Sequence, residues 1–323
     1  MKTALKILGA LLLMLVLAGG GFYVWASMRV SGLMSRTVET HAVDFPVPWP
    51  LTAAEIEALP APDSAEQVAL VRAVERGRHL ITSRYACTEC HGANLGGGVM
   101  VDDPVLGTML GPNITTGRGS AVSAYEPRDW DRTVRHGVGP SGNPLAMPAQ
   151  DFQLMSDQEL SDVVAYVRSL PPVDSDPIVS VDLGPLGNVL VALGQIPLAA
   201  DMIPTHTERH AEVPPPSEVT VELGRHIAGV CTGCHRADLS GGPIMGGDPA
   251  WPPARNLTQH ESALGTWTYE DFVRALREGR RPDGSELLSP MREATNYATN
   301  MTETELQALW AYLESLPAIA PVE

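Results

Sequence analysis

Positively charged side chains are scarce in this chain, and lysine is almost absent from it. The 323 residues include 22 lysines and arginines against 38 aspartates and glutamates, which gives a formal net charge of −16. The only lysines are Lys2 and Lys6, so arginine alone carries the positive charge of the remaining chain. Because little is available to neutralise phosphate groups, this composition argues against a nucleic-acid partner. A protein that docks here would more readily present a basic surface than an acidic one.

Cysteine is also rare. The chain has four cysteines in two pairs, Cys87 with Cys90 and Cys231 with Cys234. Four cysteines are too few for a disulfide framework in a chain of this length. Each C-x-x-C pair by itself is compatible with a zinc site or with a thioredoxin-like redox motif, so the neighbouring residues must decide.

Charge is absent altogether from residues 7–26, an apolar run that follows the two lysines. A helix that crosses a bilayer needs about 20 predominantly apolar residues, and this run is just long enough. The alternative is a cleaved signal peptide with Val24-Trp25-Ala26 as the cleavage site, although the run is long for that class. We expect an uncleaved membrane helix, and either alternative places the rest of the chain outside the cytoplasm.

One segment of the chain occurs twice. The markers of this repeat recur at a nearly constant interval, between 143 and 147 residues. They are residues 77–79 (GRH) and 224–226, residues 87–91 (CTECH) and 231–235 (CTGCH), residues 113–115 (NIT) and 256–258 (NLT), and residues 169–171 (SLP) and 315–317. An interval of this size corresponds to a domain and not to a solenoid unit.

The repeat divides the chain into five predicted parts. They are a membrane anchor or signal at 1–36, a proline-rich extended spacer at 37–62, a first domain at 63–172, a linker at 173–216 and a second domain at 217–323. Within the linker, residues 183–198 are apolar but interrupted by glycine and proline. We expect them to form an irregular segment packed between the domains.

Each domain is predicted to be helical. Ser64, Ser156 and Thr302 each precede a Glu or Gln by three residues, which is the pattern of a capping box at a helix start. Apolar residues spaced by three and four follow in the last helix of each domain, and a proline ends that helix. Residues 130–136 and 268–278 are predicted as a further pair of helices, each ended by a glycine. No run alternates with a period of two, so the predicted fold class is all-α.

The histidine after each cysteine pair decides the chemistry of that pair. In C-x-x-C-H the two thiols can add to the vinyl groups of a haem, and the histidine then ligates its iron. A zinc site would need a second cysteine or histidine pair nearby, and a redox motif would need a βαβ pattern; neither is visible. We therefore predict two covalently attached haem c groups, held by Cys87, Cys90 and His91 and by Cys231, Cys234 and His235.

Methionines at one matched position are the candidates for the sixth ligand of each iron. Met147 lies as far after His91 in the sequence as Met291 lies after His235. The sixth ligand must reach the haem face opposite the histidine, so it must lie well downstream. Met155 and Met301 also correspond, but each stands at the start of a last helix, where a core role is favoured. The predicted iron ligands are His91 with Met147 and His235 with Met291.

Asn113 and Asn256 begin the repeated N-x-T motif. The motif also fits a glycosylation sequon, but its repetition favours a structural role at the haem edge, either bonding the propionates or holding the loop. The carbonyl of Pro112 is a candidate partner for the other ring nitrogen of His91. His79 and His226 correspond to each other and are expected to have surface or packing roles.

Residues 87–171 and 224–317 resemble tandem class I c-type cytochrome domains. Beside C-x-x-C-H, the resemblance rests on NIT or NLT, a helix ending in R-x-G, a methionine loop and a closing AYVRSLP or AYLESLP. This combination is similar to the cytochrome subunits of bacterial membrane-bound alcohol and aldehyde dehydrogenases. The resemblance implies a haem fold of three to five helices, His/Met ligation and periplasmic electron transfer. Those subunits generally carry three haem modules, however, and no proline follows Met291.

The predicted function is electron transfer by a dihaem c-type cytochrome in an extracytoplasmic respiratory or dehydrogenase-linked chain, without enzymatic activity of its own. Its partners would be a donor dehydrogenase or quinol-oxidising complex and an acceptor oxidase or other cytochrome. We expect a single helix in a bacterial inner membrane with the haem domains in the periplasm, or a soluble periplasmic protein if the helix is cleaved. A dihaem peroxidase would need an open iron position, which the matched methionines disfavour. A sensor would need a signalling domain, and none is visible.

Overall fold

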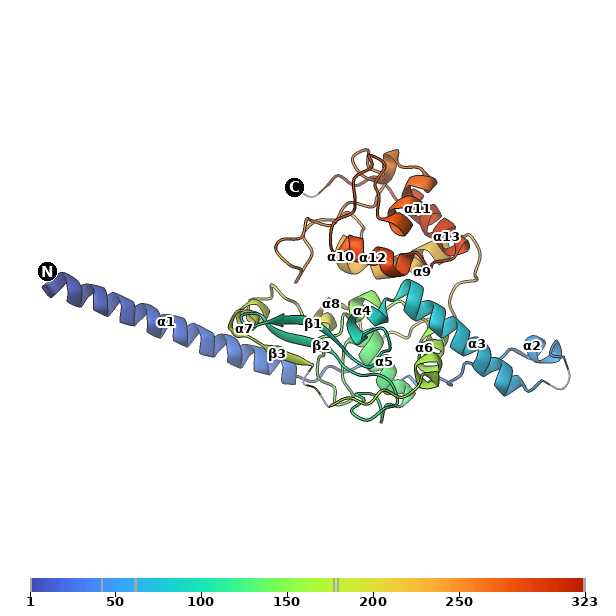
Figure 1. The fold of residues 1–323 in the computed structure, drawn as a ribbon, viewed down its shortest axis with the longest axis horizontal. Helices are drawn as coiled ribbons and strands as arrows, with labels where there is room; N and C mark the ends of the chain where they lie inside the picture. Colours follow the sequence, from blue (N-terminus) through green and yellow to red (C-terminus); the bar gives the residue numbers. More distant parts are fainter. Residues whose placement is uncertain (1, 42, 61–62, 177, 179, 322–323) are drawn as a thin grey trace.

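The chain folds into a long N-terminal helix and two mainly helical lobes (Figure 1). The computed structural model describes residues 2–41, 43–60, 63–176, 178 and 180–321. Helices dominate both lobes, so the predicted all-α fold class is confirmed, with one small sheet in addition.

The first lobe is built on two long helices that pack along each other, α3 (Ala65–His79) and α6 (Asp157–Ser169). Its other helical elements are α2 (Ala53–Glu57), the π-helical turn η1 (Leu80–Arg84), α4 (Cys87–His91), α5 (Pro127–His136) and the 3-10 turn η2 (Ala149–Asp151). The predicted capping box of Ser156 with Glu159 is confirmed at the start of α6. The predicted box at Ser64 is wrong, because that side chain makes no cap hydrogen bond to the described residues, although α3 still begins at Ala65.

The second lobe repeats this plan. Its helical elements are α9 (Val221–Ala228), η3 (Gly229–Cys231), α10 (Thr232–His235), η4 (Leu264–Thr266), α11 (Tyr269–Glu278), α12 (Met291–Ala298) and α13 (Glu303–Glu314). Helix α9 packs on α13 as α3 packs on α6, and Thr302 forms the predicted capping box. The glycines predicted to end α5 and α11 do so with left-handed backbone, at φ 64° for Gly137 and 70° for Gly279.

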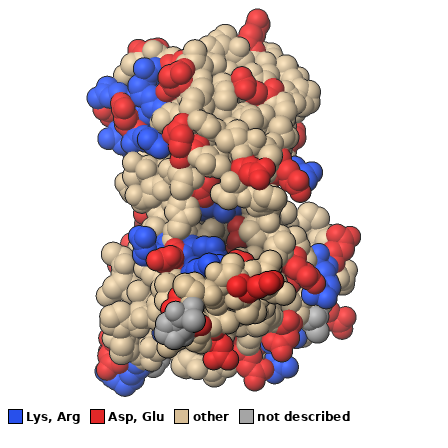
Figure 2. Space-filling view, turned by 90° about the vertical axis from the view of Figure 1, so that its right-hand side faces the viewer, with Lys and Arg blue, Asp and Glu red and all other residues tan. Residues whose placement is uncertain are grey.

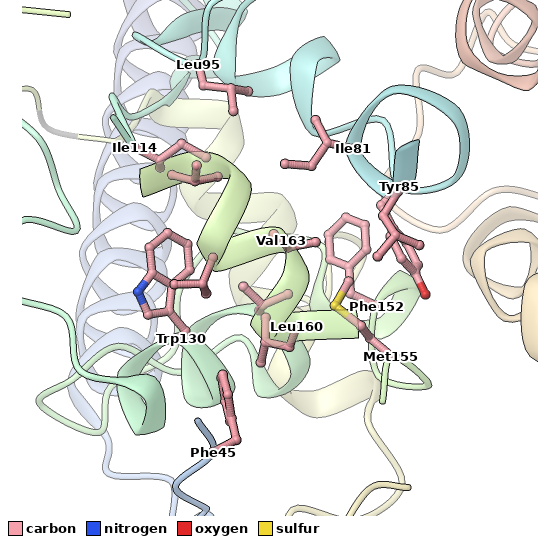
Figure 3. Packing of buried hydrophobic residues seen from close by; sticks show 14 of the residues in the cluster. Phe45, Ile81, Tyr85, Leu95, Ile114, Trp130, Phe152, Met155, Leu160 and Val163 are labelled. Atoms are coloured by element: carbon pink, nitrogen blue, oxygen red, sulfur yellow. The ribbon is translucent and has the colours of Figure 1, made fainter. Parts of the chain in front are cut away.

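Each lobe has its own hydrophobic core. In the first lobe, large side chains such as Trp130, Phe152 and Leu160 gather around α6 (Figure 3). Val43 and Phe45, from the stretch predicted as an extended spacer, are buried in the same core at 3% and 4% exposure. Part of that stretch is therefore packed against the first lobe, and another part forms α2.

A small antiparallel sheet in the first lobe was absent from the sequence prediction. Its strands are β1 (Gly98–Asp103), β2 (Gly107–Gly111) and β3 (Val181–Leu183), in the order β1-β2-β3. The register of β1 shifts between Val99 and Val101, which disrupts the period-two alternation. Because β3 comes from the linker, the sheet attaches the start of the linker to the first lobe.

The expectation of an irregular segment at residues 183–198 is wrong. This stretch contains α7 (Pro185–Ala192), which packs against the N-terminal helix α1 (Lys2–Ser35) and not between the lobes. The proline and glycine residues expected to interrupt this stretch are compatible with the helix. Pro185 occupies its first turn, where proline is tolerated. A side chain at Gly187 would lie 2.1 Å from the carbonyl oxygen of Leu106, so this glycine permits close packing.

Helix α1 is long and apolar enough to cross a membrane, and the most apolar part of it is fully exposed. Its C-terminal part is held by α7, through buried Ala26 and Val30 and a 2.8 Å hydrogen bond from Arg29 Nε to the carbonyl of Ala192. Figure 1 shows the remainder projecting freely from the first lobe.

The repeated G-R-H segment marks the point where the paired helices cross. A β-carbon at Gly77 would lie 2.0 Å from the carbonyl oxygen of Asp162, and one at Gly224 would lie 2.0 Å from that of Ala308. No side chain fits at these distances, so the two glycines set the spacing of α3 on α6 and of α9 on α13.

We predict that Gly77→Ala and Gly224→Ala each destabilise their lobe by about 1–3 kcal/mol through overpacking. We expect the upper part of this range, because the clash is with backbone and outweighs the gain of about 1 kcal/mol in helix propensity. Chemical unfolding of the haem-loaded chain measures the change. Glu75→Ala and Glu222→Ala, at matched exposed positions on the same helices, should change stability by less than about 0.5 kcal/mol. Equal stability of the glycine and control variants would contradict the close crossing.

Candidate functional site

The two C-x-x-C-H segments have the same local geometry. His91 ends α4 and His235 ends α10, and each imidazole bonds a backbone carbonyl through Nδ1. His91 Nδ1 donates to the carbonyl of Pro112 at 2.7 Å, and His235 Nδ1 donates to that of Arg255 at 2.6 Å. The contact with Pro112 is the predicted one, and Arg255 is its counterpart in the second copy.

These hydrogen bonds prepare both histidines to ligate a metal. A proton on Nδ1 leaves the lone pair of Nε2 free. Burial lowers the pKa of His91 and of His235, against the opposing effect of the carbonyl bond, so both imidazoles are neutral at physiological pH. A neutral imidazole of fixed tautomer is the form that binds iron.

A largely apolar cavity of about 350 Å³ lies beside the first segment. Cys87, Cys90 and His91 line it together with Met147, the predicted sixth ligand. The remaining wall is mostly hydrophobic and includes Trp130 of α5. Two thiols, an imidazole and a thioether around one apolar space are the donor set that a covalently bound haem requires, so the residues present fit this group.

The other methionines are placed as the sequence analysis expects. Met155 is 1% exposed in the first core, and Met301 is 8% exposed in the second. Met155 also borders the cavity, which makes it the rival to Met147. Met291 is the first residue of α12 and is partly exposed, so its assignment rests on the matched interval and stays a prediction.

The cysteines do not have the character of a redox-active dithiol. Burial raises the pKa of Cys87 to about 12, and that of Cys231 to about 12 as well. A thioredoxin-like pair needs a thiolate of lowered pKa. The thiols here are neutral, which agrees with the interpretation of C-x-x-C-H as an attachment motif.

Asn113 and Asn256 hold the loop between the attachment segment and the last turn of each domain. Asn113 Nδ2 donates to the carbonyl of Val173 at 2.6 Å, and Asn256 Nδ2 donates to that of Ile319 at 2.7 Å. Their Oδ1 atoms accept from the backbone of Thr115 and of Thr258. Both ends of each amide are thus engaged within the protein, which matches the loop-holding alternative for the N-x-T motif.

The attachment segment of the second lobe packs against η2 of the first lobe. Asp151 of η2 packs against α10 so closely that a β-carbon at Gly233 would lie 1.9 Å from its Oδ1 atom. After burial, the charge of Asp151 contributes to raising the pKa of Cys90 in one lobe and of Cys234 in the other. Leu154 packs on Gly229 beside this contact. The glycine of C-T-G-C is therefore an interface position, where the first copy has Glu89.

Reciprocal histidine–carboxylate pairs join the lobes. His79 Nε2 lies 2.9 Å from Glu305 of the second lobe, and His226 Nε2 lies 2.9 Å from Glu159 of the first. Arg84 is buried between the two carboxylates, 3.0 Å from Glu159 and 3.9 Å from Glu305. Figure 2 shows the lobes meeting at a waist where basic and acidic side chains lie together.

The sequence pattern predicts only surface or packing roles for the two histidines and does not predict this contact. A signal was present, since both the histidines and the capping-box glutamates recur at matched positions. Nothing in the pattern showed, however, that each histidine reaches the other copy.

Comparison with known proteins gives a consistent result. The family described as "Cytochrome C oxidase, cbb3-type, subunit III" matches residues 72–167, and the family described as "Cytochrome c" matches residues 221–317. The alcohol dehydrogenase (quinone) cytochrome c subunit of Gluconacetobacter polyoxogenes is 29% identical over 264 residues, which cover 73% of this chain and 54% of that protein. The fructose dehydrogenase cytochrome subunit of Gluconobacter japonicus is 25% identical over 285 residues, 81% of this chain and 55% of that one.

This chain thus spans about half the length of these dehydrogenase subunits. A shorter relative, the diheme cytochrome c-type protein of Cereibacter sphaeroides, is 26% identical over 260 residues. That alignment covers 72% of this chain and 82% of the relative, so the two proteins are similar in extent.

The contact between the lobes should weaken in acid. Burial raises the pKa of Glu159, but the hydrogen bond from His226 and the charge of Arg84 outweigh it and lower the pKa from 4.5 to about 2. A carboxyl with a lowered folded-state pKa stabilises the fold above its unfolded pKa, and this contribution is lost as the pH falls through the folded value. We expect the lobes to stay in contact above about pH 4.5 and to separate between there and pH 2, seen as a larger radius of gyration in solution X-ray scattering.

Glu159→Gln should loosen the lobes already at neutral pH, while Glu314→Gln, at an exposed position of α13, should have no effect. A radius of gyration that is constant across this pH window and in Glu159→Gln would show that the pairs do not hold the interface.

Proposed function

Because this chain is a c-type cytochrome, with two cytochrome c domains and two covalently bound haem c groups, we propose that it passes electrons between other proteins and transforms no substrate itself. The observation that carries the proposal is the contact between the two domains at Asp151 and Gly233, where η2 of the first domain packs on the attachment segment of the second. We propose this contact as the path for electrons from one haem domain to the other.

The proposed haem contacts follow the repeat. Cys87 and Cys90 hold one haem, with His91 and Met147 as iron ligands. Cys231 and Cys234 hold the other, with His235 and Met291. When bound, a haem iron between an imidazole and a thioether gains and loses one electron reversibly. The protein supports this by presenting a neutral Nε2 and by surrounding the first site with apolar side chains.

We propose a membrane-bound dehydrogenase or a quinol-oxidising complex as the electron donor, and an oxidase or another cytochrome as the acceptor. The relatives named as subunits of alcohol, fructose and gluconate dehydrogenases support the first choice. The net charge of −16 favours partners with a basic docking surface. The division of the chain proposed from the repeat, at 1–36, 37–62, 63–172, 173–216 and 217–323, assigns one haem to each of the two large parts.

Helix α1 is proposed as an anchor in a bacterial inner membrane, with both haem domains on the periplasmic side. Its exposed apolar surface supports this location. We expect the mature protein to require detergent for extraction and to begin near Met1. An N-terminus at Ser27 in the purified protein would establish instead a cleaved signal and a soluble periplasmic form.

The sixth ligands are tested by methionine replacement in the haem-loaded chain. With Met147 and Met291 bound, both haems should be low-spin, and neither ferrous haem should bind carbon monoxide readily. Met147→Leu should open one iron, so that half of the haem binds carbon monoxide, and should lower the reduction potential of that haem. Met291→Leu should do the same for the other haem.

Met155→Leu and Met301→Leu are the matched controls, because they remove the rival sulfurs from the two cores without touching the proposed ligands. They should leave the spectrum and the carbon monoxide response unchanged. Rapid peroxide turnover by the unmodified protein, with one high-spin haem, would contradict the carrier function and favour a dihaem peroxidase.

A further inference from the structure

Four of the nine histidines lie in one partly buried cluster beside the first lobe, away from the attachment segments. The histidine cluster consists of His41, His136, His206 and His210, with Asp131 beside them. His41 precedes the first domain, Asp131 and His136 belong to α5, and the other two come from the linker. Side chains far apart in sequence thus converge on one point.

The spacing of the polar atoms matches a tetrahedral metal site. One ligand atom each from His41, Asp131, His136 and His210 lies within 4.8 Å of all the others. The separations include 3.3 Å between Nε2 of His136 and Nε2 of His210, and 3.8 Å between His41 Nε2 and Asp131 Oδ2. A tetrahedral zinc ion with ligands at about 2.0–2.1 Å places them about 3.3–3.4 Å apart. A small inward movement would complete the site.

The hydrogen bonds around the cluster turn lone pairs toward its centre. His206 Nε2 donates to the carbonyl of Ala200 at 2.9 Å, so its Nδ1 accepts from Nδ1 of His136 at 3.1 Å. His41 Nδ1 donates to the backbone carbonyl of His206 at 3.1 Å. Nε2 of both His41 and His136 is therefore without a proton. His206 serves as the outer partner that fixes these tautomers, as such partners do for metal-binding histidines.

The third imidazole follows the same pattern. The ring of His210 hydrogen-bonds the backbone of Gln153, which is a role for Nδ1 because Nε2 faces His136. Burial lowers the pKa of His136 to about 2 and of His210 to about 3, with neighbouring positive groups adding to the effect. The facing lone pairs of His136 and His210 repel each other at this short separation unless a cation lies between them.

Two buried atoms of the cluster have no hydrogen-bond partner among the described residues. They are Nε2 of His41 and Oδ2 of Asp131, which both point into it. The other oxygen of Asp131 accepts from Arg135 Nε at 2.8 Å, and Arg135 also pairs with Asp157. Arg209 lies 3.8 Å from the other oxygen of Asp157, so two guanidinium groups face the two carboxylates and Oδ2 of Asp131 stays directed at the histidines. An unpaired polar atom in such a buried place is unfavourable, and a bound cation would offset that cost.

We propose that His41, Asp131, His136 and His210 bind one divalent transition-metal ion, for which zinc is the best fit to three imidazoles and a carboxylate. Four protein ligands leave no open position, so the ion is structural. It ties the segment after the N-terminal helix and the end of the linker to α5, whose Trp130, Thr133 and Val134 line the haem cavity.

The second domain does not share the site. Val273 and Glu278 stand where the first domain has Asp131 and His136, and the remaining ligands lie outside the repeat. The site is thus specific to the first domain and is independent of the haem contacts, which both domains have.

Metal analysis of the haem-loaded full chain, purified without a histidine tag, tests this proposal. We expect two iron atoms and one zinc atom per chain, and X-ray absorption at the zinc edge should show nitrogen and oxygen neighbours at about 2.0–2.1 Å. A strong chelator should remove the zinc, lower the melting temperature and leave both haems in place. Added Zn²⁺ should restore the melting temperature, and Mg²⁺ should not.

Variants separate ligands from other histidines. His41→Ala and His210→Ala should each lose the zinc, while His206→Ala should weaken zinc binding by about 10- to 100-fold because it frees the tautomer of His136. His260→Ala, at a partly exposed histidine of the second lobe, should keep one zinc ion per chain. An unchanged helical circular-dichroism spectrum and unchanged low-spin haem spectra in each variant show that the chain is folded. Less than one-tenth of an equivalent of any divalent transition metal, with no rise in melting temperature on adding Zn²⁺, would overturn the proposal, and so would full zinc content in His41→Ala and His210→Ala.

Discussion

A buried guanidinium lies at the centre of the contact between the two haem domains. Arg84 lies between Glu159 of its own lobe and Glu305 of the other, and it also stacks over the ring of Tyr85 at 5.3 Å. A buried charge is tolerated only when it is paired, and breaking such a pair costs about 3–5 kcal/mol. His79 also hydrogen-bonds Glu305, and His226 also hydrogen-bonds Glu159. The relative position of the lobes depends on this group of five side chains.

The same carboxylates belong to the folds of the individual domains. Glu159 and Glu305 are the third residues of α6 and α13, where each accepts a hydrogen bond from the backbone of its capping residue. The interface therefore uses groups that every copy of the domain already needs. Because both copies present the same histidine and the same glutamate, the contact is reciprocal. The π-helical turn at the end of α3 supplies Arg84, the one residue of this group that has no counterpart in the second domain.

With the lobes in this position, Asp151 of η2 lies against the attachment segment of the second lobe and near Cys90 of the first. Burial raises the pKa of Asp151 to about 7, so this carboxyl is partly protonated at neutral pH. The first domain carries further structure that the second lacks, namely the sheet, the contact of α7 with α1 and the histidine cluster. These additions connect the N-terminal helix and the linker to one domain only. The second domain is held chiefly through the interface.

The local features of this protein were determined by its sequence alone. Both C-x-x-C-H segments, the capping boxes at Ser156 and Thr302 and the helix-ending glycines depend on residues within a few positions of one another, and the repeat shows in the matching of such short segments. The carbonyl partner of His91 was predictable for a related reason, since it precedes a repeated motif. Local features of this kind can be predicted from the spacing of residues in the sequence.

Only the tertiary structure decided the rest. Residues 185–192, in the stretch predicted to be irregular, form a helix because they pack against α1 and the sheet. Strand β1 was not predicted because its bulge interrupts the period-two alternation. His79 contacts Glu305, which lies 226 residues later in the sequence, and His41 lies near Asp131, which is 90 residues later. A repeat shows that two residues are equivalent, but not that one copy binds the other. Contacts between distant residues arise when separate elements bury their surfaces together, and no local pattern in the chain records which polar groups are enclosed by that packing.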